Sequence, residues 1–167
     1  MAGSNKIYVS RRKRGLGHPD AYKTVRRAAN AALSAEGVDM PCELYVMLTD
    51  DAGIRAINLE TRGVDAATDV LSFPLNVLSP GGFDGEICEK DPDTGRVLLG
   101  DMVLSVPRCE AQGEEFGHGF DREITYLAVH SVLHLLGYDH IDEGLDKRRM
   151  RSREKAIMSL LGAPEPD

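Results

Sequence analysis

The sequence lacks the features of a membrane or secreted protein. No apolar run reaches the length of a transmembrane helix, and the N-terminus has no apolar region typical of a signal peptide. The three cysteines, Cys42, Cys88 and Cys109, are odd in number, widely spaced and outside any C-x-x-C motif, so no disulfide framework is expected. These absences predict a cytoplasmic protein with buried thiols and no membrane partner.

Positive charge is scarce over most of the chain. The formal net charge is −7, which argues against broad binding to nucleic acid. Two segments are nevertheless strongly basic, at residues 11–14 and 147–155. An acidic body with two basic segments permits contact with an RNA backbone over a limited surface. The alternative is that both segments are ordinary solvated faces.

Length and patterning predict one α+β domain. A chain of 167 residues with 42% apolar residues suits one sizeable core, and no internal repeat divides it. Apolar spacing and turn residues predict strands at 7–9, 43–48, 70–73 and 102–106, and helices at 19–36, about 50–62, 121–136 and 143–161. Residues 78–96 are rich in Gly, Pro and Asp and predict a long loop that borders the functional site.

The most informative stretch runs from His130 to His140. His130 and His134 are one helical turn apart, so both imidazoles lie on one face of a helix. Gly137 can adopt the left-handed conformation that ends a helix, after which the chain can bring His140 to the same point. Three imidazoles with a fourth position open are typical of catalytic zinc, whereas structural zinc usually has four ligands, mostly cysteines. The spacing predicts one zinc ion per chain, held by His130, His134 and His140.

One residue of a related pattern is missing. The spacing matches the H-E-x-x-H-x-x-G-x-x-H arrangement of metzincin proteases, whose glutamate is the general base on the zinc-bound water. Here that position is Ser131, which has no basic side chain at neutral pH. The pattern therefore favours another hydrolytic reaction. A metal-dependent peptidase or other hydrolase, and histidines that are simply satisfied core residues, remain as alternatives.

Four blocks of sequence resemble the bacterial YbeY family of ribosomal-RNA maturation endoribonucleases. In chain order they are Asn58-Leu59-x-x-Arg62, TDVLSFP at residues 68–74, LGDMVLS at residues 99–105 and HSVLHLLGYDH at residues 130–140. The family often has glycine where this chain has Ser131, and both residues are small. The resemblance implies one α+β domain over residues 1–167, with a central buried helix packed against a four-stranded mixed sheet and further flanking helices.

The resemblance also implies the activity. It implies zinc on His130, His134 and His140, and an arginine needed for activity at Arg62. The implied function is single-strand-specific cleavage of RNA in 16S ribosomal RNA 3′-end maturation and in late ribosome quality control. The partners it implies are single-stranded RNA, 16S rRNA and the ribosome or its proteins, with no DNA expected.

Two of these residues have simpler interpretations. Arg62 would offer a planar, permanently charged group to a phosphate, or it is a surface arginine at a helix end. Asp139 would orient an imidazole, or it forms the turn beside Gly137. A third function class, a non-catalytic ribosome-associated protein that uses zinc only to fold, also remains open. Either water or the neighbouring 2′-hydroxyl can attack the phosphate.

Overall fold

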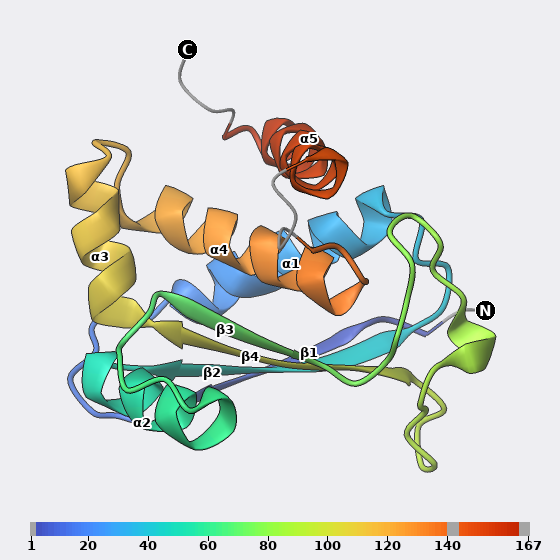
Figure 1. The fold of residues 1–167 in the computed structure, drawn as a ribbon, viewed down its shortest axis with the longest axis horizontal. Coiled ribbons are helices and arrows are strands. Elements are labelled where there is room, and N and C mark those ends of the chain that lie inside the picture. Colours follow the sequence, from blue (N-terminus) through green and yellow to red (C-terminus); the bar gives the residue numbers. More distant parts are fainter. Residues whose placement is uncertain (1–2, 140–143, 164–167) are drawn as a thin grey trace.

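The computed structural model describes residues 3–139 and 144–163 (Figure 1). Its strands are β1 (Lys6–Arg11), β2 (Cys42–Thr49), β3 (Val70–Pro74) and β4 (Val97–Ser105). Its helices are α1 (Ala21–Ala35), α2 (Asp51–Arg62), α3 (Val106–Glu115), α4 (Phe120–Leu135) and α5 (Leu145–Leu160), with a 3-10 turn, η1 (Gly85–Ile87). The predicted α+β class is confirmed.

The sheet is mixed, as predicted. Its strand order is β1-β2-β4-β3; β1, β2 and β4 run parallel, and β3 runs antiparallel to β4 at the edge. This edge strand packs against α4, so side chains that β3 directs toward α4 meet the helix that carries the histidines.

Strand β4 is longer than the sequence predicted. It begins at Val97, whereas the apolar pattern placed its start at 102. The register between β2 and β4 shifts near Leu44, which marks a bulge, and Gly100 has a φ of 138°. A Cβ on Gly100 would lie 2.2 Å from the carbonyl oxygen of Phe73 on β3. Gly100 and Asp101 thus interrupt the apolar pattern, but the strand continues through them.

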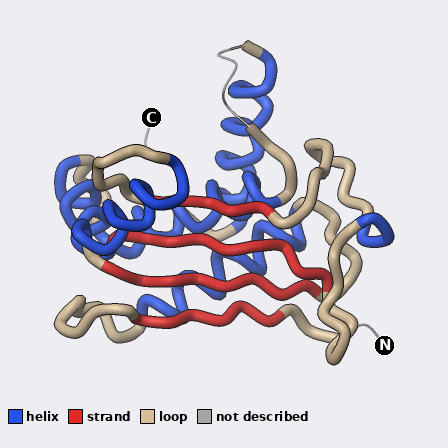
Figure 2. Tube along the Cα trace, turned by 60° about the horizontal axis from the view of Figure 1, so that its bottom comes forward, coloured by secondary structure: helices blue, strands red, loops and turns tan. Residues whose placement is uncertain are grey.

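The helices form layers on the two faces of the sheet. Helices α1 and α4 cover one face, α5 packs on the outer side of these two, and α2 lies on the opposite face (Figure 1). Figure 2 shows that opposite face, with the strands toward the viewer and most helices behind them. Nine residues of α4 are buried, so the predicted central helix is confirmed, within one residue of its predicted bounds. None of the described helices has the length and apolarity needed to cross a bilayer.

Helix α5 differs from its prediction at its start. Leu145, an apolar residue of the predicted helix at 143–161, is 72% exposed, and residue 143, the predicted first residue, lies outside the described part of the chain. The stripe that α5 buries consists of Met150, Glu154, Ile157 and Met158. The stretch from residue 75 to 96 is mostly the predicted loop, interrupted by η1 and by a bridge between Lys90 and Val97.

Candidate functional site

The C-terminal end of α4 carries His130 and His134. The helix ends at Leu135, and Gly137, two residues later, has a φ of 101°. A Cβ on Gly137 would lie 2.2 Å from the carbonyl oxygen of Leu78, so only glycine allows the chain to turn this close to the loop. The turn brings the Tyr138 carbonyl back to His134. The predicted return of His140 to the same point lies outside the described residues.

The two imidazoles are held in matching tautomers. Nδ1 of His130 lies 3.1 Å from Oε2 of Glu154, and Nδ1 of His134 lies 3.0 Å from the carbonyl oxygen of Tyr138. A carboxylate and a carbonyl only accept hydrogen bonds, so each Nδ1 is the donor and each Nε2 presents a lone pair. Both imidazoles therefore offer the nitrogen that commonly ligates metals.

The two Nε2 atoms face each other at 3.1 Å. Two unprotonated nitrogens at this distance repel unless a proton or a metal ion lies between them. Two nitrogen ligands of a tetrahedral zinc ion lie about 3.3 Å apart, so this pair of donors fits zinc. The third predicted ligand, His140, lies outside the described residues. Within residues 3–139 and 144–163, no group of three His, Cys, Asp or Glu side chains is placed to hold a metal ion.

The partner of His130 was not anticipated from the sequence. Glu154 lies on α5 and is 5% exposed, although it belongs to a strongly basic segment. Its position one turn after Met150 and one turn before Ile157 places it on the buried stripe of the helix. An acidic residue on an apolar stripe is the signal that could have found it.

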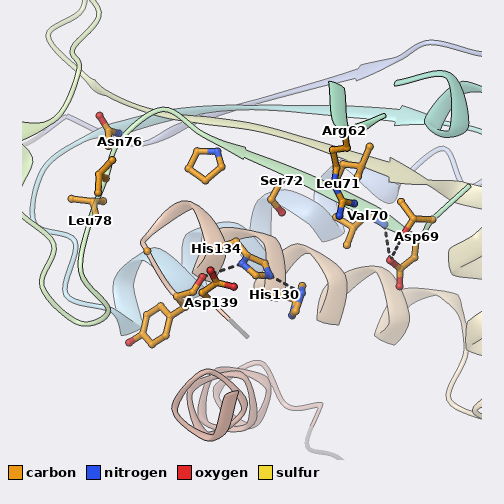
Figure 3. A pocket seen from close by; sticks show the side chains of 15 residues that line it. Arg62, Asp69, Val70, Leu71, Ser72, Asn76, Leu78, His130, His134 and Asp139 are labelled. Carbon is orange, nitrogen blue, oxygen red and sulfur yellow. Dashed lines mark hydrogen bonds between the residues drawn. The ribbon is translucent and has the colours of Figure 1, made fainter. Parts of the chain in front are cut away.

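The histidines lie in a cleft of about 690 Å³ between α4, β3 and the end of α2. In Figure 3, His130 and His134 lie beside the β3 strand that carries Ser72, and Arg62 reaches into the same space. The polar lining residues are Arg62, Thr68, Asp69, Ser72, Asn76, His130, His134, Tyr138 and Asp139. Leu78, from the start of the predicted long loop, also lines the cleft, so that loop does border the site.

Arg62 is the last residue of α2, and Gly63 ends the helix in the left-handed conformation. Its Nη1 lies 3.4 Å from Oδ1 of Asn58, a buried side chain whose amide donates to the carbonyl of Ala66 at 2.9 Å. The helix end therefore directs an exposed guanidinium into the cleft that contains His130. The structure brings Arg62 and the two histidines together in one cleft. The catalytic role of Arg62 remains a prediction.

Asp139 is exposed and lines the same cleft. The acceptor for Nδ1 of His134 is the preceding residue's carbonyl, from Tyr138. Burial, together with a hydrogen bond and the charge of Glu36, raises the pKa of the Tyr138 phenol to about 12. Tyr138 is therefore a neutral donor to Glu36, which holds the turn that carries Asp139 against the end of α1.

Ser131 occupies the position of the metzincin glutamate, and it points into the protein. Its side chain is fully buried, and its Oγ lies 2.6 Å from Oγ of Ser72 on β3. This pair of hydroxyls ties α4 to the edge strand beside the cleft. Residue 131 therefore cannot act as a general base on a bound water, because serine has no basic side chain at neutral pH and this hydroxyl is buried against Ser72.

A second imidazole–carboxylate pair lies outside the cleft. Nε2 of His118 is 3.4 Å from Oε2 of Glu123, and burial raises the pKa of the Glu123 carboxyl. Neither residue lines the cleft. His118 lies in the loop between α3 and α4 and provides a natural control for the site histidines.

Comparisons with known proteins identify the family of this chain. The family model described as Endoribonuclease YbeY matches residues 7–162. An Endoribonuclease YbeY of Clostridium kluyveri is 45% identical over 142 residues, covering 81% of this chain and 86% of the relative. One from Clostridium botulinum strain Alaska E43 is 41% identical over 162 residues, covering 93% and 97%.

A solved structure supports the fold. The solution structure of TM1509 from Thermotoga maritima aligns with a TM-score of 0.55 at 19% identity, covering 93% of this chain and 91% of that one. The family match covers every described strand and helix except part of β1. The chain belongs to the YbeY endoribonuclease family.

Proposed function

We propose that this protein is a zinc-dependent, single-strand-specific endoribonuclease that acts in 16S ribosomal RNA 3′-end maturation and in late ribosome quality control. One observation supports a metal-dependent reaction. The Nε2 atoms of His130 and His134 face each other at 3.1 Å, in a cleft that Arg62 also lines. Family membership supports the ribonuclease reaction. The ribosomal role rests on the resemblance of the sequence blocks.

The proposed metal ligands are His130, His134 and His140. These residues would hold zinc, and the chemistry it would supply there is Lewis-acid catalysis and activation of water. Glu154 and the Tyr138 carbonyl fix the orientation of two imidazoles, so little reorganisation accompanies the reaction. Arg62 orients the phosphate and offsets the negative charge that builds during cleavage, because its guanidinium is always charged and can donate two parallel hydrogen bonds.

RNA contact beyond the cleft is proposed for α5. Its exposed basic residues are Lys147, Arg148, Arg149, Arg151 and Lys155. Helix α5 also carries Glu154, so this basic surface belongs to the helix that touches the site. Lysine and arginine here can bind phosphates on either side of the cleaved bond. A single strand can bend a phosphate into the cleft, whereas a paired strand is held in the shape of a duplex.

Peptide cleavage is the weaker alternative. The position that a metzincin uses for its base holds Ser131, which is buried against Ser72. A non-catalytic zinc protein of the ribosome would need no phosphate-binding group in the cleft, yet Arg62 lies there. We therefore expect a cytoplasmic enzyme whose partners are single-stranded RNA, 16S rRNA and the ribosome.

The direct test is cleavage of labelled single-stranded and fully paired RNA by protein of measured zinc content. We expect the single strand to be cut and the duplex to be spared. His134→Ala should lose zinc and cleavage, and Arg62→Ala should keep zinc while cleavage falls about 100-fold or more, the effect typical of removing one donor to a developing charge. A 2′,3′-cyclic phosphate product would identify the 2′-hydroxyl as the attacking group.

Two matched variants serve as controls. His118→Ala removes an imidazole outside the cleft, and Arg55→Ala removes an exposed arginine of α2 that pairs with Asp65. Both should keep zinc content and cleavage close to those of the unmodified protein. Cleavage that survives His134→Ala, or zinc that is retained in full by it, would contradict the proposed site.

A further inference from the structure

The most unusual ionisable residue outside the predicted ligand set is Glu154. It is buried on a helix whose basic residues mostly face solvent, and its neighbours on the stripe are Met150 and Ile157. Burying a carboxylate is costly unless it is hydrogen-bonded or paired. The partners that stabilise the buried carboxylate of Glu154 therefore indicate its role.

Both carboxylate oxygens of Glu154 contact α4. Oε2 lies 3.1 Å from Nδ1 of His130, and Oε1 accepts from the hydroxyl of Tyr126 at 3.3 Å. Tyr126 and His130 are one turn apart on α4, so the carboxylate spans two side chains of one helical face. This arrangement fixes the carboxylate and, through it, the plane of the His130 ring.

We infer that Glu154 is the positioning residue for His130, so that this carboxylate, carried by α5, sets the metal affinity of the site. The carboxylate accepts the hydrogen bond from Nδ1 of His130 and thereby orients Nε2 as the ligand. His134 obtains the same tautomer from the Tyr138 carbonyl, within its own helix end. One ligand is therefore oriented locally and the other by a separate helix.

This inference rests on the proposed metal site, but its first readout needs no metal. The chain has only five histidines, so the imidazole nitrogens can be resolved by long-range 1H–15N NMR in metal-free protein. We expect His130 to carry its proton on Nδ1 in the unmodified protein. Glu154→Ala should move His130 toward the other tautomer and leave His134 unchanged.

The second readout is zinc affinity, measured by competition with a chromogenic chelator. Loss of such a partner of a metal-ligating histidine typically lowers metal affinity about 10–100-fold, and we expect this for Glu154→Ala. Glu154→Gln keeps an acceptor oxygen but not the charge, so its effect should be smaller. Met150→Ala loosens α5 on the same buried stripe and keeps the carboxylate that contacts His130, so the zinc affinity of this variant should stay within about threefold of the unmodified protein.

The outcomes separate the two proposals. If Glu154→Ala changes neither the His130 tautomer nor the zinc affinity, the inference is wrong. If Met150→Ala weakens zinc as much as Glu154→Ala does, packing of α5 rather than the carboxylate controls the site, and the inference is again wrong. If the unmodified protein fails to bind zinc, the proposed function fails before any variant is compared, and the tautomer still decides whether Glu154 positions His130.

Discussion

The two imidazoles of the site are supported in different ways. His134 is oriented by a carbonyl four residues further along the chain, at the turn that ends its own helix. His130 is oriented by Glu154, which lies 24 residues away on α5. The first contact forms once the chain turns at Gly137 after α4, whereas the second exists only after two helices pack. The candidate site thus has a local half, His134 and its turn, and a long-range half, His130 with Glu154.

The two halves meet at Glu36, just after α1. Its Oε2 accepts from Nε of Arg153 at 2.7 Å, and its Oε1 accepts from the hydroxyl of Tyr138. Tyr138 belongs to the turn that supports His134, and Arg153 precedes Glu154 on α5. A single carboxylate therefore fixes both supports relative to α1, and the comparison can be tested at each half and at their junction.

The largest effect is expected from breaking the local half with Gly137→Ala. The backbone there has a φ of 101°, and the new Cβ would lie 2.2 Å from a backbone oxygen of Leu78. Left-handed strain costs about 1–2 kcal/mol, and the collision with backbone adds to it, so we expect a loss of about 3 kcal/mol or more in the free energy of unfolding. Urea unfolding of metal-free protein measures this.

Gly63→Ala is the matched control for that variant. Gly63 also has a positive φ, 70°, but a Cβ there meets no atom within 4 Å. We expect a loss of about 1 kcal/mol, from backbone strain alone. Equal losses in the two variants would mean that the approach of Gly137 to Leu78 contributes nothing, and that the turn is not a rigid support for His134.

The contrast between the two halves also explains what the sequence could predict. The spacing of His130 and His134 places both rings on one helical face in any context, and the apolar run around them predicted a buried central helix; both are confirmed. Local turn chemistry likewise predicted the end of α2 at Gly63. The placement of Arg62 in the cleft came from resemblance, because helix spacing does not say which elements of the sheet lie nearby.

Features set by packing between distant segments were missed. The contact of Glu154 with His130 depends on how α5 crosses α4, and only an acid on an apolar stripe marks it in the sequence. The early start of β4 was missed because Gly100 is required by the close approach of β3, which no local pattern reveals. The exposure of Leu145 has the same origin, since an apolar residue at a helix start is buried only where a neighbour covers it.

An intermediate effect is expected at the junction of the two halves. The side chain of Glu36 is only 4% exposed and is bound to Arg153 and Tyr138. Glu36→Gln removes the charge but keeps the shape, and hydrogen bonds to charged groups contribute about 1.5–3 kcal/mol. We expect a loss of about 2 kcal/mol in unfolding free energy, and a zinc affinity lowered several-fold because both supports shift.

Glu110→Gln is the control for the junction variant. Glu110 is an exposed carboxylate that faces His18, and surface pairs contribute little. Its stability should change by about 0.5 kcal/mol or less, with zinc affinity unchanged. If Glu36→Gln behaves like Glu110→Gln, the two supports are independent, and the site is better described as two separate contacts.

The smallest effect is expected from Tyr126→Phe, which tests how the Glu154 carboxylate is held in the long-range half of the site. It removes the donor to Oε1 of Glu154 and leaves the contact of Oε2 with His130 in place. One long hydrogen bond to a buried carboxylate contributes about 1 kcal/mol or less, so unfolding free energy should fall by that amount while zinc affinity changes by about threefold at most. Tyr22→Phe, at a half-buried position on α1, controls for removing a phenolic hydroxyl. A larger loss of zinc affinity in Tyr126→Phe than in Glu154→Gln would show that orientation of His130 depends on how the carboxylate is anchored rather than on its charge.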